Sequence, residues 1–216
     1  MEEESPKCSI LKSTTFRLIV LMALLYALDQ VTKWYIVMHY NAPLPIFPIL
    51  DGTAVLKDNG ILHFNIIRIH NTGVAFGLGN GQPWAPFVFL GVQVVALVGL
   101  IWLYVRGFFN TLMLKFAWVF VMVGVLGNMT DRLLQGFFLP GVEGLSFLDK
   151  LRLGYVVDFL DFSFPWLVLD EFPNGYHWPA FNVADSCVCI AAGLFIIASF
   201  IAKDKNAKAA DAETVS

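Results

Sequence analysis

We expect a membrane protein with four transmembrane helices in one bundle, a small β-rich segment and a loop or short helix outside the membrane. Composition, hydropathy and segment length all favour this class. Of the 216 residues, 57% are hydrophobic and 14% are charged, whereas a soluble domain has roughly 45 to 50% apolar and about 25% charged residues. The mean hydropathy is +0.68. Four segments approach the roughly 20 apolar residues that a helix needs to cross a bilayer.

The expected spans lie at about residues 16–35, 87–105, 112–134 and 181–202. The second span is the cleanest, because only Gln93 interrupts its apolar run. Trp84, Trp102 and Tyr104 lie near its ends, and aromatic rings are typical of the two membrane–water interfaces. We therefore expect residues 1–202 to form a single membrane-embedded domain.

Basic residues flank the spans on one side of the membrane. They precede the first span, lie in the short turn between the second and third spans, and follow the fourth: Lys7, Lys12, Arg17, Arg106, Lys115, Lys203, Lys205 and Lys208. Because cytoplasmic flanks carry an excess of Lys and Arg, both termini are predicted to be cytoplasmic. Residues 203–216 are polar and rich in alanine, and we expect a disordered cytoplasmic tail there.

Two longer segments then lie on the outer side, at about residues 36–86 and 135–180. Within the first, residues 62–70 read LHFNIIRIH and are bounded by turn signals at Asn59-Gly60 and Asn71-Thr72-Gly73. This pattern predicts one or two strands. The second segment combines a loop rich in Gly, Pro and Leu with an aromatic stretch from Tyr155 to Trp178.

The composition also excludes several classes of function. The formal net charge is −3, so no basic field is available to hold nucleic acid. The four histidines, His39, His63, His70 and His177, are scattered and form no H-E-x-x-H motif, so we expect no metal site and no cofactor. G-x-S-x-G is also absent.

Polar side chains gather at the outer ends of three spans. A charged residue at the membrane midplane costs about 2.5 to 3.5 kcal/mol, so such residues normally face the bundle interior or a water-filled cavity. Within each span they are three or four residues apart, on one helical face. Their common depth predicts a polar pocket near the outer surface. They are Asp29, Lys33, Asn128, Asp131, Arg132, Asn182 and Asp185.

Two interpretations remain open for the oppositely charged neighbours, which are Asp29 with Lys33 and Asp131 with Arg132. In one, the four residues form an interhelical ion-pair network that ties the bundle together. In the other, they position a substrate. Under either interpretation Lys33 and Arg132 are matched by Asp29 and Asp131, so the other acidic groups have no assigned cation.

Asp185 is therefore left to pair with another group, and Asp158 in the outer loop, flanked by apolar residues, is a candidate. Two carboxylates in a low-dielectric site share a proton, as a water-activating acid/base pair requires. The alternative is a solvated Asp158 and an Asp185 that caps its helix near the positive N-terminus.

Five ordered blocks of this sequence resemble a known family, the bacterial lipoprotein signal peptidases (signal peptidase II), which are intramembrane aspartyl proteases. Each block is short, but their order and their positions relative to the spans make the resemblance specific. The blocks are Asp29-Gln30-Val31-Thr32-Lys33, Asn71-Thr72-Gly73-Val74-Ala75-Phe76-Gly77, Gly127-Asn128-Met129-Thr130-Asp131-Arg132-Leu133, Val156-Val157-Asp158-Phe159 and Phe181-Asn182-Val183-Ala184-Asp185-Ser186.

The resemblance implies that Asp158 and Asp185 are the catalytic dyad of an aspartic endopeptidase. It implies a prolipoprotein substrate modified with diacylglyceryl, cut just before the lipidated cysteine, in the bacterial inner membrane with the active site near the outer leaflet. Membrane lipids are the other expected partner, and we expect a monomer. The residues that the resemblance assigns to substrate binding or support are Asp29, Lys33, Asn71, Gly73, Asn128, Arg132, Asn182 and Ala184.

The chain departs from the family pattern between Leu133 and Leu153, which separate two blocks that usually lie within a few residues of each other. The rival function is a proton-coupled transporter that uses Asp131 and Asp185. It predicts polar residues throughout the membrane depth, whereas the inner halves of the last three spans are almost wholly apolar. A non-catalytic lipid-binding scaffold is a third reading, and it would tolerate the loss of either aspartate of the dyad.

Overall fold

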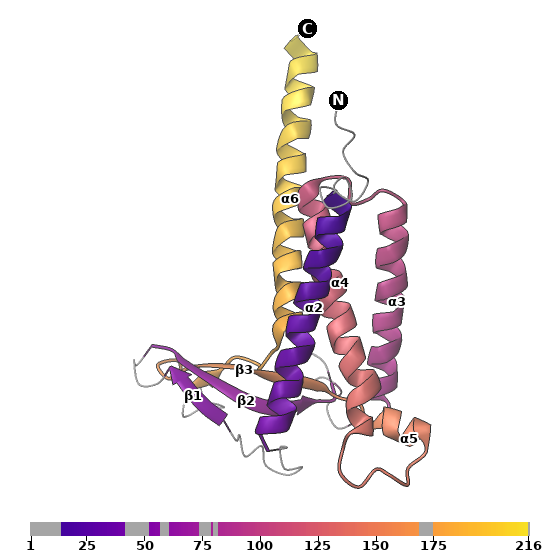
Figure 1. Cartoon of the computed structure of the whole chain (residues 1–216). Coiled ribbons are helices and arrows are strands. Elements are labelled where there is room, and N and C mark those ends of the chain that lie inside the picture. The colour runs from indigo at the N-terminus through magenta and orange to yellow at the C-terminus, as the bar shows by residue number, and fades with distance from the viewer. Residues whose placement is uncertain are drawn as a thin grey trace, which may run out of the picture.

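The protein is described by a computed structural model (Figure 1), which covers residues 14–41, 52–56, 61–73, 79, 82–168 and 175–215. Lys7 and Lys12, and the end of the second motif block from Val74 to Gly77, lie outside these residues. The described part consists of a helical bundle with a sheet and a short helix at one end.

Four helices form the bundle: α2 (Thr14–His39), α3 (Ala85–Val105), α4 (Leu112–Leu134) and α6 (Val183–Val215). Each contains a stretch long and apolar enough to cross a membrane, which confirms the four expected spans. Helix α4 is central, because it packs against the other three. The chain is a multi-pass membrane protein.

Local sequence explains where these helices begin. Helix α4 starts after Thr111, whose side-chain oxygen accepts a hydrogen bond from the Leu114 N–H at 3.2 Å, a typical N-cap. Helix α3 has Pro86 in its first turn, where a missing N–H has no consequence. Gly107, with φ of 77°, allows the tight turn between the two helices.

The end of α6 differs from the expected disordered tail at 203–216, because the helix continues through Val215. Its last part is rich in Ala and Lys, which have high helix propensity. Extending an existing helix also avoids the unfavourable nucleation step. Composition alone therefore indicated disorder for a segment that continues a membrane helix.

A four-stranded antiparallel sheet lies at one end of the bundle, in the order β1-β2-β3-β4. Its strands are β1 (Gly52–Leu56), β2 (His63–Asn71), β3 (Val156–Phe164) and β4 (Tyr176–His177). Strand β2 confirms the strand expected at residues 62–70. Strand β3 was not predicted, because Val156 to Phe159 are all buried and the apolar/polar alternation of a half-buried strand is missing there.

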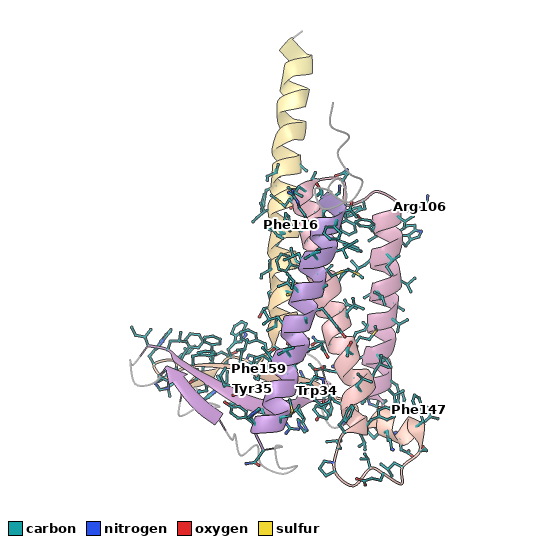
Figure 2. All side chains as sticks on the ribbon, in the orientation of Figure 1. Trp34, Tyr35, Arg106, Phe116, Phe147 and Phe159 are labelled. Atoms are coloured by element: carbon teal, nitrogen blue, oxygen red, sulfur yellow. The ribbon has the colours of Figure 1, made fainter. Side chains whose placement is uncertain are left out.

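The remaining elements lie in the segment between α4 and β3. They are the 3₁₀ helix η2 (Gln135–Phe137) and the short helix α5 (Phe147–Arg152), which fits the expected loop or short helix. The sheet meets the bundle through a buried apolar cluster of Ile36, Tyr155, Val157 and Phe159. Figure 2 shows Tyr35 and Phe159 at this junction, and both line the same cavity; Trp34 lies at the same end of α2, and Phe147 lies on α5 beyond the bundle.

Close helix packing at Gly127 gives a first prediction. A Cβ on Gly127 would lie 2.5 Å from Asp29 Oδ2 and 2.9 Å from Ala184 Cβ. Gly127→Ala should therefore push α2 and α6 away from α4 and reduce the free energy of unfolding by about 1 to 3 kcal/mol. The matched control is Gly99→Ala, since nothing lies within 4 Å of a Cβ there. Thermal unfolding in detergent measures both, and equal unfolding temperatures for the two variants would contradict this packing.

Candidate active site

Asp158 and Asp185 are brought to a single residue, Asn182. Asp158 lies on β3 and is only 2% exposed, and Asp185 lies in the first turn of α6. The side-chain amide of Asn182 donates to Asp158 Oδ1 at 2.8 Å, and its backbone N–H donates to Asp185 Oδ2 at 3.1 Å. The two acids lie in separate segments of the sequence, and the fold joins them through one buried asparagine.

Asp185 also caps the helix that carries it. Its own N–H donates to Asn182 Oδ1 at 2.9 Å, so the two residues form a reciprocal capping box. The next free N–H of the helix, from Ala184, donates to Asp29 Oδ1 at 2.8 Å. The helix-capping interpretation of Asp185 is therefore correct, and it is compatible with a place in the acidic pair.

The remaining oxygens of the two carboxyls each accept a hydrogen bond from another asparagine. Asn71 Nδ2 lies 2.9 Å from Asp158 Oδ2, and Asn128 Nδ2 lies 2.8 Å from Asp185 Oδ1. Gly73 N–H donates to Asn71 Oδ1 at 3.0 Å, which fixes the amide orientation of that residue. Among the residues that the structure describes, every carboxylate oxygen of the pair thus has one N–H partner, which leaves its second lone pair for a proton or a water.

Lys33 determines how Asn128 is oriented. The Lys33 side chain is fully buried, and its Nζ contacts Asp29 Oδ2 at 2.9 Å, Asp131 Oδ2 at 3.1 Å and Asn128 Oδ1 at 2.9 Å. Since an ammonium only donates, Asn128 must direct its oxygen to Lys33 and its NH₂ group to Asp185. The ion pair of Asp29 with Lys33 is present, and it also orients a contact of the acidic pair.

The expected pairing of Asp131 with Arg132 is wrong. Asp131 pairs with Lys33 and accepts the Val157 N–H at 3.0 Å. Adjacent residues lie about 100° apart around a helix, so Arg132 points elsewhere. It donates to the carbonyls of Thr72, at 3.4 Å, and Gly73, and lies 5.3 Å from the centre of the Phe89 ring. In the described part of the chain, its Nε has no hydrogen-bond partner.

The environment of Asp158 favours its protonated form. Burial in the low-dielectric interior is the main cause, and the nearby charge of Asp185 adds to it, so that the pKa of Asp158 rises to about 8. The hydrogen bonds from Asn71 and Asn182 oppose this shift. At neutral pH, Asp158 therefore retains a proton beside a second carboxyl, as the shared-proton hypothesis requires.

Sequence reasoning missed part of this site. Gln30 belongs to the first motif block but was not among the predicted site residues, yet its Nε2 donates to Asp29 Oδ2 at 3.0 Å and to the Gly127 carbonyl at 3.2 Å. Asp131 was expected to pair with its neighbour, and the backbone N–H of Val157 was not considered. The position of Gln30 between Asp29 and Lys33 on one helix was the available signal.

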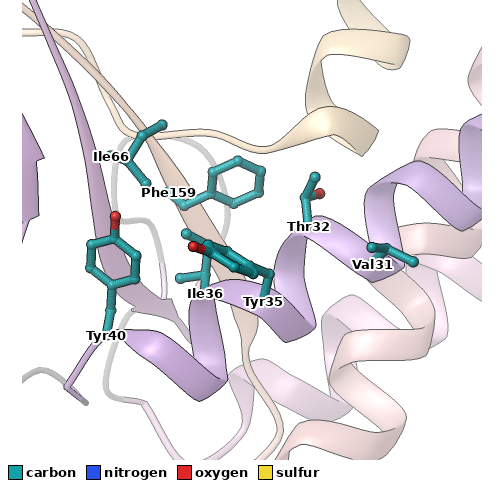
Figure 3. A pocket seen from close by; sticks show the side chains of 7 residues that line it. All are labelled: Val31, Thr32, Tyr35, Ile36, Tyr40, Ile66 and Phe159. Atoms are coloured by element: carbon teal, nitrogen blue, oxygen red, sulfur yellow. The ribbon is translucent and has the colours of Figure 1, made fainter. Parts of the chain in front are cut away.

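An apolar cavity of about 330 Å³ lies where α2 meets the strands (Figure 3). Phe159, the residue after Asp158, is part of its wall. Its lining comes from the C-terminal end of α2 and from β2 and β3: Val31, Thr32, Tyr35, Ile36, Tyr40, Ile66 and Phe159. A mostly apolar surface thus lies close to the strand that carries one of the two acids.

Comparison with known proteins decides the family. A family model described as "Signal peptidase (SPase) II" matches residues 21–201. The chain belongs to the signal peptidase II family. A lipoprotein signal peptidase of Alteromonas mediterranea is 31% identical over 207 residues, covering 95% of this chain and 92% of the relative. One from Syntrophotalea carbinolica is 32% identical over 194 residues, covering 88% and 95%.

Solved structures agree with this assignment. A structure described as a bacterial membrane enzyme, determined at 2.3 Å resolution, has a TM-score of 0.60 and 26% identity, covering 89% of this chain and 91% of that one. The family supports the expected aspartic peptidase. The proton-coupled transporter based on Asp131 and Asp185 is not supported, and the ion pair with Lys33 gives Asp131 a different role.

The buried charges of this signal peptidase II site give a second prediction. Lys33→Met would leave Asp29 and Asp131 without their cation, at a cost of about 3 to 5 kcal/mol in the free energy of unfolding. The double variant Lys33→Met/Asp131→Asn should recover part of this loss, because one uncompensated charge is removed. The control is Lys203→Met at an exposed position. Thermal unfolding measures the stability of all three variants. An unfolding temperature of Lys33→Met equal to that of the wild type would refute the ion-pair account.

Proposed function

We propose that this protein removes the signal peptide from diacylglyceryl-modified bacterial prolipoproteins, cutting just before the lipidated cysteine, with Asp158 and Asp185 as the catalytic dyad. One observation carries the assignment of the dyad: both carboxyls bind the same buried residue, Asn182, at 2.8 and 3.1 Å. The names of the relatives supply the class of substrate.

The chemistry requires one carboxyl in each protonation state. The ionised acid takes a proton from a bound water, whose oxygen attacks the scissile carbonyl carbon, while the protonated acid donates to the carbonyl oxygen. Collapse of the tetrahedral species breaks the C–N bond, and a dyad proton passes to the leaving amine. Burial of Asp158 supports its role as the initial donor, with Asp185 accepting the proton from water.

Polar groups near the dyad are suited to hold the substrate backbone. Arg132 is anchored by the carbonyls of Thr72 and Gly73. Its buried Nε–H has no partner among the described residues, and we assign it as a donor for a substrate carbonyl. Asn71 and Asn128 act on the dyad itself by orienting its carboxyls. The apolar cavity beside Phe159 offers a surface for hydrocarbon.

We place the dyad near the outer leaflet of the bacterial inner membrane, with both termini cytoplasmic. The sheet and α5 lie at the end of the bundle opposite to Arg106, which flanks the short turn between α3 and α4 (Figures 1 and 2). The positive-inside rule puts that turn in the cytoplasm. A single peptidase domain over residues 1–202 and a monomeric state complete the proposal.

The dyad assignment is tested by conservative substitutions. Asp158→Asn and Asp185→Asn should each reduce cleavage of a lipidated prolipoprotein by at least about 10²- to 10⁴-fold, because neither amide can exchange a proton as the mechanism requires. Unfolding temperatures should show that both variants fold. The matched control is Asp161→Asn on the same strand, a buried acid that contacts Asn65 and His177 instead of the dyad. Normal turnover in either dyad variant would exclude the proposal.

The raised pKa of Asp158 predicts a loss of activity in alkaline solution. Above about pH 8 the dyad loses its shared proton, so no group can donate to the carbonyl. The value of kcat/KM should then fall by about tenfold per pH unit. Initial rates between pH 5 and 10, in wild type and in Asp161→Asn, measure the profile. A constant rate up to pH 10 would mean that no proton with this pKa takes part.

A further inference from the structure

A second buried polar cluster lies where the sheet meets the end of α2. Its centre is Arg68 on β2, which is 8% exposed. Arg68 Nη1 donates to the carbonyls of Val37 and Tyr40, at 2.9 and 2.8 Å. These carbonyls belong to the C-terminal end of α2, where a cation is favoured by the helix dipole. Arg68 therefore binds strand β2 to the end of helix α2.

His70 holds the other side of the same guanidinium. Arg68 Nε donates to His70 Nε2 at 3.1 Å, and the imidazole stacks on the Tyr155 ring at 3.7 Å between centroids. Because Arg68 can only donate, His70 Nε2 must be an acceptor, and the ring must be neutral. Burial and the charge of Arg68 lower the pKa of His70 to about 3, which agrees with this requirement.

The cluster also reaches α4. The Tyr155 hydroxyl lies 3.5 Å from Arg68 Nη2 and 3.5 Å from Oε1 of Gln135, which caps the C-terminal end of α4. These distances are at the limit of a hydrogen bond, so the Tyr155 hydroxyl is the weakest contact of the cluster. The Arg68 and His70 contacts are the short ones.

The residues that hold Asp158 and the residues that hold Asp185 lie on opposite sides of this junction. Asn71, the residue after His70, holds Asp158, and Ile69 pairs with Asp158 in the sheet. On the bundle side, Lys33 of α2 orients Asn128, which holds Asp185. The strand register shifts between Ile66 and Ile69, so Arg68 lies within a bulge, and bulges re-aim side chains near active sites.

We propose that Arg68 and His70 are positioning residues that set the separation of the Asp158 and Asp185 carboxyls by docking strand β2 on the C-terminal end of α2. In the described part of the chain, neither side chain is hydrogen-bonded to Asp158 or Asp185. The proposal rests on the proposed function, because it takes the dyad as the catalytic pair.

The experiment compares four variants that change this junction only. Arg68→Met removes the guanidinium, and His70→Leu removes the acceptor of Arg68 Nε. His70→Gln keeps an acceptor, and Tyr155→Phe removes only the distant hydroxyl. The charged groups that face the dyad, Asp29, Lys33, Asp131 and Arg132, are unchanged in all four. We would measure kcat, KM and the pH profile of cleavage on a lipidated prolipoprotein peptide, together with the unfolding temperature.

Arg68→Met and His70→Leu should lower kcat at least about tenfold, since small misplacements of reacting groups are costly, with KM within about twofold. A looser junction admits water to Asp158 and moves it away from Asp185. Both changes lower the pKa of Asp158, so the alkaline limb should move down by about half a pH unit or more. His70→Gln should keep most of the wild-type kcat and the wild-type alkaline limb of the pH profile. Tyr155→Phe should resemble wild type.

A purely structural role would lower the unfolding temperature and leave kcat and the alkaline limb of the folded protein unchanged, and that result would overturn the inference. If Arg68→Met does not fold, the difference in kcat and in the alkaline limb between His70→Leu and His70→Gln tests the inference. Asp158→Asn is assayed in parallel. Activity in Asp158→Asn would reject the proposed function, whereas an inactive Asp158→Asn beside a fully active His70→Leu would reject the positioning role alone.

Discussion

The site depends on one fully buried ammonium group, that of Lys33. Taken alone, its transfer from water would cost several kcal/mol, so its three N–H donors must all be satisfied. Asp29, Asp131 and Asn128 satisfy them at 2.9 to 3.1 Å. The two carboxylates exceed the single positive charge, and backbone N–H groups compensate the excess: Ala184 at the start of α6 donates to Asp29, and Val157 of β3 donates to Asp131. One cation thereby fixes α2, α4, α6 and β3 relative to one another.

A consequence of this arrangement is that stability and catalysis use the same groups. Asp185 closes the first turn of α6 with Asn182, and it is also half of the proposed dyad. The partial positive charge at a helix N-terminus stabilises an ionised carboxylate. Asp158 has no such helix, and it lies on a strand at 2% exposure. The two identical side chains therefore lie in different surroundings, one at a helix N-terminus and one within a sheet, and different surroundings are how a pair of acids acquires separate roles.

The sequence predicts those features whose signals lie within one short segment. The spans and strand β2 were predicted because hydropathy and turn residues are properties of short segments. The common depth of Asp29, Asn128 and Asn182 also followed, because helical spacing and topology place them. Strand β3 was missed because its burial on both faces removes the alternation of side chains. The sequence did not predict that Lys33, and not Arg132, pairs with Asp131, because ion pairing depends on how the helices are rotated in the packed bundle. Choosing Asp158 for the dyad needed the family resemblance, since spacing alone left a solvated loop acid as an alternative.

The junction between sheet and bundle could not be predicted from the sequence, because no local pattern in HFNIIRIHN distinguishes Arg68 or His70 from solvent-facing strand residues. An arginine and a histidine two residues apart on a predicted strand would ordinarily be assigned to its solvent face. Arg68 is buried here, with His70 half-buried beside it, because the end of α2 presents carbonyls that need a donor, and this need exists only after the chain has folded. An acid on a sheet strand and an acid on a membrane helix can meet reproducibly only if strand and helix are fastened together. Motif residues supply part of this fastening, through Asp131 and the Val157 N–H, and the Arg68 and His70 contacts add to it from outside every motif that resembles the family.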